Sequence, residues 1–368
     1  MTDTSEQANE PAAKFADRRG ILVRIAKVLI AIAVVIGLYF AARSAVIQWK
    51  GEGDKLRLQI AKIDEALAQT DEAETRSQLQ KSKAKLVAAV PRLENLNWGR
   101  VALASFLYAI GLIPPSFILR RALLSLGQKP RVGTALAAQL LGHVGKYVPG
   151  KAMVVILRAG VLTRDGVRPL AATISVFLET FLMMAVGAAV AGIVVVWLPV
   201  PRWIAVAAVL VSILASLPTL PPILRRVAAR VSKVELAEID SKIGIGLFAA
   251  GWGWSIIGWL LIGASFTTLI TAIPTSAPSP PPLELFATAT AAISLAVVVG
   301  FASLLPGGAG VRELVLITVL SVSIGSVHGL LAAIAARIMF IVVESVLAGA
   351  AWIWLRRSEG ALVSADRG

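Results

Sequence analysis

Residues 134–160 read TALAAQLLGHVGKYVPGKAMVVILRAG, two apolar segments separated by Pro149 and Gly150. The apolar run before Pro149 is about 15 residues long, whereas a helix needs roughly 20 residues to cross a bilayer. Proline lacks an amide donor and glycine is a poor helix former, so a helix is expected to break at this pair. Because basic residues flank both ends of the stretch, we expect the chain to return to the same side, as a re-entrant helical hairpin.

A second interrupted stretch, FASLLPGGAGVRELVLITVL, occupies residues 301–320. Its Pro-Gly-Gly interruption at 306–308 is followed closely by Arg312 and Glu313. The apolar segment 284–305 that precedes it is just long enough to span. The sequence therefore leaves open whether 284–325 is re-entrant or crosses the membrane twice.

The two stretches share one order of features. Each has an apolar helix, a Pro-Gly break, a short helix, a glycine and a long apolar segment that contains an ionisable residue. Glu179 follows Pro149 by 30 residues, and Arg337 follows Pro306 by 31. The spans that lead into the two stretches are expected to enter from opposite sides. This order predicts an inverted repeat whose broken helices meet near the bilayer midplane.

Composition places the whole chain in a membrane. Of its 368 residues, 57% are hydrophobic and only 16% are charged, against about 45–50% and 25% in soluble domains. The fold class predicted is an all-α polytopic membrane bundle of about six full spans plus the two Pro-Gly-broken hairpins. The six predicted spans are 25–47, 98–119, 170–198, 203–222, 245–271 and 327–355. With no cysteine and two histidines, we expect no metal site and no cofactor.

The net charge of +14 comes from basic segments that all fall on one side of the predicted spans. This bias predicts a multi-pass protein of the bacterial inner (plasma) membrane with both termini in the cytoplasm. Nucleic-acid binding is not expected, because no basic groove with interleaved aromatic residues is present. The predicted parts are a cytoplasmic tail (1–24), the first span (25–47), an extracytoplasmic helical hairpin (48–97), a transport-like core (98–355) and a cytoplasmic tail (356–368).

The hairpin at 48–97 carries apolar residues at helical spacing, beginning with Leu56, Ile60, Ile63 and Leu67. Two interpretations remain open for it. It is either a solvated spacer or an element, at 52–94, that docks a protein partner. The sequence does not define an oligomeric state.

Three charges lie inside predicted spans, at Glu179, Arg337 and Glu344. Each costs about 2.5–3.5 kcal/mol at a helix centre, so we expect them to face one another or a hydrated cavity. Arg337 and Glu344, seven residues apart on one helix face, are candidates for a structural ion pair. The cations around the first break are candidates either for binding a phosphate or for reaching the lipid headgroups.

These motifs resemble the lysylphosphatidylglycerol synthase transmembrane-domain family, the membrane module of the multiple peptide resistance factors. The resemblance rests on GKYVPGK at 145–151, Arg158, Gly166-Val167, Glu179, LPGGAGVRE at 305–313 and Arg337. It implies translocation of a lipid between leaflets. Because the chain ends thirteen residues after Leu355, we expect no aminoacyltransferase domain and no lysyl transfer. The 49–97 insertion exceeds the usual loop of the family.

The resulting hypothesis is a non-enzymatic lipid flippase whose partners are membrane lipids. Lys146, Lys151, Arg158 and Arg312 are expected to engage phosphate, and Glu179 and Glu313 to balance charge. The complete set of predicted translocation residues is His143, Lys146, Tyr147, Pro149, Gly150, Lys151, Arg158, Glu179, Pro306, Gly307, Gly308, Arg312, Glu313, Arg337 and Glu344. The alternatives are an enzyme or accessory protein of polyprenyl-linked or hopanoid lipid metabolism, and a non-transporting scaffold.

Overall fold

The computed structural model describes residues 53–90, 92–147, 152–198, 201–223, 244–275, 279–303 and 310–365, together with the isolated positions 39, 43, 47, 50, 51, 226 and 308. Several predicted features lie outside the described residues: the tail 1–24, nearly all of the span 25–47, and Pro149, Gly150, Lys151, Pro306 and Gly307.

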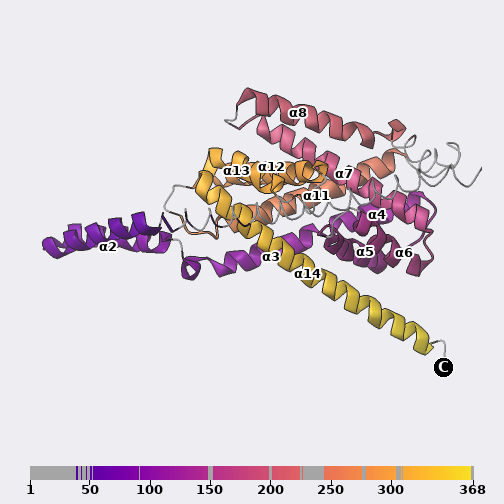
Figure 1. Ribbon diagram of the computed structural model, residues 1–368, viewed down its shortest axis with the longest axis horizontal. Coiled ribbons are helices and arrows are strands. Elements are labelled where there is room, and N and C mark those ends of the chain that lie inside the picture. Colours follow the sequence, from indigo (N-terminus) through magenta and orange to yellow (C-terminus); the bar gives the residue numbers. More distant parts are fainter. Residues whose placement is uncertain are drawn as a thin grey trace, which may run out of the picture.

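The described part of the chain is helical throughout, which confirms the predicted all-α membrane bundle (Figure 1). Five of its helices are long and apolar enough to cross a membrane. They are Trp98–Ser125, Pro169–Val195, Ile245–Ile270, Pro282–Ala302 and Ser326–Ser358.

The structure differs from the predicted spans at 203–222. This segment forms α8 (Arg202–Ser216) followed by a 3-10 turn at Leu217–Thr219. A helix of 15 residues is only about 23 Å long, shorter than the roughly 30 Å hydrocarbon core. The side chains of Trp203 and Leu214 are 72% and 65% exposed, as expected for an apolar helix that faces lipid.

The span at Trp98–Ser125 consists of two helices, α3 (Trp98–Gly111) and α4 (Pro114–Ser125). Pro114 and Pro115 open α4 and have no amide hydrogen to continue the bonding pattern of α3. The chain therefore forms two helices at this pair instead of one. The second, α4, ends at Ser125, six residues beyond the predicted end of the span at 119. The next charged segment then leads into α5.

The stretch 134–160 forms two short helices, α5 (Val132–Gly145) and α6 (Ala152–Leu162). Gly145 at the end of α5 lies against Val154 at the start of α6, while Gly142 lies against Arg158 further along. The two helices are therefore antiparallel. At 14 and 11 residues they measure about 21 and 17 Å, and neither reaches across a bilayer.

The two halves of the core repeat one order of elements. In the first half, α6 leads through Gly166 to α7 (Pro169–Val195); in the second, α12 (Pro282–Ala302) and α13 (Val311–Ile324) lead through Gly325 to α14 (Ser326–Ala365). Both glycines have positive φ, +73° and +81°, which other residues rarely adopt. The pair α5–α6 lies toward one end of the bundle and α13 toward the other (Figure 1).

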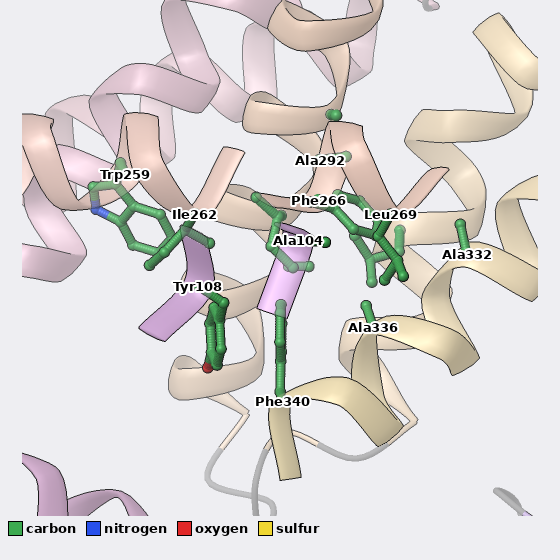
Figure 2. Close-up of a cluster of buried hydrophobic side chains, with 14 of the residues drawn as sticks. Ala104, Tyr108, Trp259, Ile262, Phe266, Leu269, Ala292, Ala332, Ala336 and Phe340 are labelled. Carbon is green, nitrogen blue, oxygen red and sulfur yellow. The ribbon is translucent and has the colours of Figure 1, made fainter. Parts of the chain in front are cut away.

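The core packs α3 and α11 (Ile245–Ile270) against α12 and α14 (Figure 2). Tyr108 of α3 stacks on Phe340 of α14 with ring centroids 3.9 Å apart. Trp259 of α11 is 1% exposed and donates its indole N–H to the Met183 carbonyl at 2.9 Å. Close packing of aromatic residues thus fixes the helices that carry the polar groups described below.

A helical hairpin precedes the core. Residues 53–69 form one helix and α2 (Ala73–Ala89) the other, followed by a 3-10 turn at Leu93–Asn95. Leu56 packs against Ala89 and Val90, and Lys83 bridges to Asp64 across the pair. The hairpin extends away from one end of the bundle (Figure 1).

Candidate functional site

A cavity of about 260 Å³ lies between the two halves of the core. The first half contributes residues of α5, α6 and α7 to its wall, and the second contributes residues of α12, α13 and α14. Pockets for whole drug-sized ligands occupy about 300–1,000 Å³, so this space suits a polar headgroup better than a complete lipid. Its polar wall consists of Tyr108, Gln139, His143, Lys146, Arg158, Glu179, Thr180 and Arg312.

An ion pair between Arg158 and Glu179 lines the cavity on the side of the first half. Arg158 of α6 donates from Nη1 to Glu179 Oε2 of α7 at 2.6 Å, and the two residues are 5% and 3% exposed. Gln139 of α5 donates from Nε2 to the other carboxylate oxygen at 3.3 Å. A Cβ on Gly142 would overlap the Arg158 side chain, so glycine at this position makes room for the guanidinium. Two predicted site residues are thus brought together.

A second ion pair lies in the second half. Arg337 of α14 donates to Glu313 Oε1 of α13 at 3.1 Å, while Glu313 Oε2 accepts from the Gly310 amide at 2.7 Å. Glu313 therefore both caps α13 and neutralises Arg337. The alternative in which Arg337 pairs with Glu344 along one helix face is wrong, because α13 supplies a carboxylate from a different helix.

The carboxylate of Glu344 has three hydrogen-bond donors instead. Tyr108 of α3 and Lys146, just after α5, donate to Oε1, and Tyr147 donates to Oε2 at 2.7 Å. Glu344 is 1% exposed, so this set of donors replaces the water that a free carboxylate would need. The contact joins the first half of the core to the second.

The two intra-half ion pairs have opposite polarity. In the first half the short helix carries the cation, Arg158, and the long helix the carboxylate, Glu179. In the second half the short helix carries the carboxylate, Glu313, and the long helix the cation, Arg337. Glu179 lies 10 residues beyond the start of its helix at Pro169, and Arg337 lies 11 beyond the start of its helix at Ser326. The two ion pairs therefore lie at similar positions along the long helices but carry opposite charges there.

Arg312 has a different environment from the other cations of the cavity. Its side chain lines the cavity, and its Nε has no hydrogen-bond partner. A Cβ on Gly300 or on Gly308 would come within 2.6 or 2.8 Å of this side chain. Gly308 also has a φ of +66°, which favours glycine there. Within the described ranges, no hydrogen bond or salt bridge involves the Arg312 guanidinium.

Three polar residues of the cavity wall, Tyr108, Gln139 and Thr180, were not predicted. Tyr108 and Gln139 both bond to buried carboxylates. A signal existed for each, because a hydroxyl or an amide in an apolar membrane helix requires a partner. His143, which was predicted, lines the cavity, and its Nε2 has no hydrogen-bond partner. Pro149, Gly150, Lys151, Pro306 and Gly307 cannot be placed, since they lie outside the described residues.

The fold and the cavity together define a multi-pass membrane protein with a charged site buried between two similar halves. The sequence profile of the family described as "Lysylphosphatidylglycerol synthase TM region" matches residues 80–348. The chain belongs to this family, as its Pro-Gly motifs suggested. No curated protein matches the chain.

Proposed function

We propose that this protein moves a phospholipid or a related amphiphile between the leaflets of the bacterial inner membrane, with both of its termini in the cytoplasm. The observation that carries the proposal is the Arg312 guanidinium, which lines a cavity between the halves with its Nε unpartnered. Membership in the lysylphosphatidylglycerol synthase TM family supports a lipid substrate. The proposed activity is transport, with no chemical step and no cofactor.

A lipid phosphate is the ligand that this arrangement favours. A guanidinium binds phosphate oxygens through charge-assisted hydrogen bonds, which strengthen where water is excluded. The volume of about 260 Å³ accommodates a headgroup, while the acyl chains of the substrate remain in the surrounding bilayer. We place Arg312 at the phosphate and assign to Lys146 and Arg158 the balancing of the buried carboxylates.

The short helices provide a route for the headgroup. We propose that α5 and α6 form a re-entrant hairpin, because they are antiparallel and each is shorter than the hydrocarbon core. Broken backbone at membrane depth is tolerated where it lines a polar cavity. In this arrangement the headgroup passes along the ends of the short helices, as in transporters whose discontinuous helices meet at the substrate.

A transport assay in proteoliposomes tests the function. Purified protein is reconstituted with acyl-labelled fluorescent phospholipid, and dithionite quenching of the outer leaflet measures lipid movement. Wild-type protein is expected to move lipid faster than protein-free vesicles, and Arg312→Gln to lose at least tenfold of that rate. The matched control is Arg121→Gln, because Arg121 is an exposed residue of α4 outside the cavity. Equal rates for wild-type protein and empty vesicles would overturn the proposal.

A further inference from the structure

Every buried carboxylate described in the core already has a cationic partner. Glu179, Glu313 and Glu344 are 3%, 5% and 1% exposed. They pair with Arg158, Arg337 and Lys146, in that order. Gln139, Tyr108 and Tyr147 donate further hydrogen bonds to two of them. A cationic ligand would therefore find no unpaired carboxylate among the described residues of the core.

The cations outnumber these carboxylates by one. Among the described residues of the core, four cations stand against three carboxylates, and the cation in excess is Arg312.

Besides Arg312 Nε, the described cavity wall has three further buried atoms without a hydrogen-bond partner, which are Arg158 Nε, Gln139 Oε1 and His143 Nε2. Gln139 is 1% exposed. Its Nε2 donates a hydrogen bond to Glu179, whereas its Oε1 has no hydrogen-bond partner. His143 Nε2 is also buried without a partner. Both residues line the same cavity as Arg312. A buried acceptor without a donor is costly, so Gln139 Oε1 favours a ligand that brings a hydroxyl group.

We propose that the cavity selects a phosphodiester lipid whose headgroup is anionic and hydroxylated, such as a glycerol phosphate, and rejects headgroups that carry an ammonium group. The inference rests on the proposed transport function and specifies its substrate class. Arg312 binds the phosphate, and Gln139 Oε1 accepts a hydrogen bond from a headgroup hydroxyl. An ammonium group meets only carboxylates that are already neutralised. Pairing of the ammonium group with Glu179 leaves the buried Arg158 without its partner, which is strongly unfavourable, and pairing with Glu344 leaves the part-buried Lys146 without its partner.

Three lipids with identical labelled acyl chains test this selectivity in the proteoliposome assay. They are phosphatidylglycerol, zwitterionic phosphatidylethanolamine and cationic lysyl-phosphatidylglycerol. We expect wild-type protein to move phosphatidylglycerol at least tenfold faster than either ammonium-bearing lipid. Equal rates for all three, or faster movement of an ammonium lipid, would overturn the selectivity and leave transport intact. Failure of all three to exceed empty vesicles would instead overturn the proposed function.

A variant that removes the proposed hydroxyl acceptor gives a second measurement. Gln139→Leu takes away Oε1 without adding a charge. The loss of its hydrogen bond to Glu179 affects all lipids alike, whereas the ratio of phosphatidylglycerol to phosphatidylethanolamine transport is expected to fall about tenfold, as for the loss of one hydrogen bond. Gln80→Leu is the matched control, since Gln80 is exposed on α2, and its ratio should equal that of wild-type protein. An unchanged ratio in a folded Gln139→Leu protein would contradict the inference, and the wild-type lipid series decides it should this variant fail to fold.

Discussion

The ammonium group of Lys146 donates a hydrogen bond to the carboxylate of Glu344, and this contact joins the end of α5 to the middle of α14. The two residues are 198 positions apart in the chain, and they belong to different halves of the core. Glu344 also accepts from Tyr108 of α3 and from Tyr147. Three segments are therefore tied to one carboxylate beside the cavity.

Replacing this carboxylate should destabilise the protein strongly. Glu344→Ala leaves the part-buried Lys146 without its partner and removes the acceptor of the Tyr108 and Tyr147 hydroxyls; breaking a buried ion pair costs about 3–5 kcal/mol. We expect a loss of this size in the free energy of unfolding, measured by a denaturant titration in detergent. Glu65→Ala is the control, because Glu65 is exposed on the 53–69 helix. A change below about 1 kcal/mol for Glu344→Ala, as is usual for exposed ion pairs, would contradict the assignment.

The exchanged polarity of the two halves predicts that the first ion pair can be reversed. Arg158→Glu and Glu179→Arg each place like charges together and should each abolish most transport. The double variant restores an ion pair of the polarity seen in Glu313–Arg337. We expect it to transport at least tenfold faster than either single variant in the same assay. A double variant no better than the singles would show that the halves are not interchangeable in charge.

The space left by Gly300 predicts a loss of function without a change of charge. The Cβ introduced by Gly300→Ala would lie 2.6 Å from the Arg312 side chain, so the guanidinium must move. We expect transport to fall about tenfold, or roughly 1.4 kcal/mol, while the loss of stability from the contact with Arg312 Cγ is partly offset by the better helix former.

Gly349→Ala is the control for this substitution. A Cβ on Gly349 in α14 meets no atom within 4 Å, so transport should remain at the wild-type rate. If the two alanine variants transport equally well, the position of Arg312 does not limit the rate.

The loop before α7 predicts a dependence of stability on pH. Burial alone would raise the pKa of Asp165, but hydrogen bonds from the Arg131 side chain and amide, at 2.7–2.9 Å, lower this pKa below its usual value. A carboxyl with a lowered folded-state pKa stabilises the fold above its unfolded-state pKa of about 4. That contribution is lost as the pH falls through the folded-state value.

Asp165→Asn should therefore lower the melting temperature at pH 7. The difference between variant and wild-type protein should narrow as the pH falls below about 4. Thermal unfolding in detergent between pH 7 and pH 3 measures it. A difference that stays constant over this range would show that the Arg131–Asp165 contact does not depend on ionisation.

The breaks at the two Pro-Gly stretches were predictable because they depend on local chemistry, whereas the break at Pro114 and Pro115 was not predicted. The Pro-Gly pair ended α5 in the prediction, and Gly166 and Gly325 marked the turns before the long helices. The prediction placed Glu179 and Arg337 at matching positions, and the structure gives each a partner on the preceding short helix.

The partners themselves were not predictable from the same signals. Arg337 and Glu344 share a helix face, so spacing alone favoured their pairing, yet helix packing brings Glu313 to Arg337 and Lys146 to Glu344. Pairing across 198 positions is decided by how helices pack, which periodicity does not encode. The role of Gln139 was missed because an amide in an apolar run carries no formal charge.

The helix α14 continues for 40 residues, from Ser326 to Ala365, a length of about 60 Å and about twice the thickness of the hydrocarbon core. Glu344 lies 21 residues before its end, so about 32 Å of rigid rod extends beyond the cavity. A small tilt of α14 at Glu344 would be amplified into a large displacement at Ala365. A fluorescent probe attached at Ala365 would therefore report a tilt of α14 that accompanies binding at the cavity, although the probe lies far from the bound headgroup.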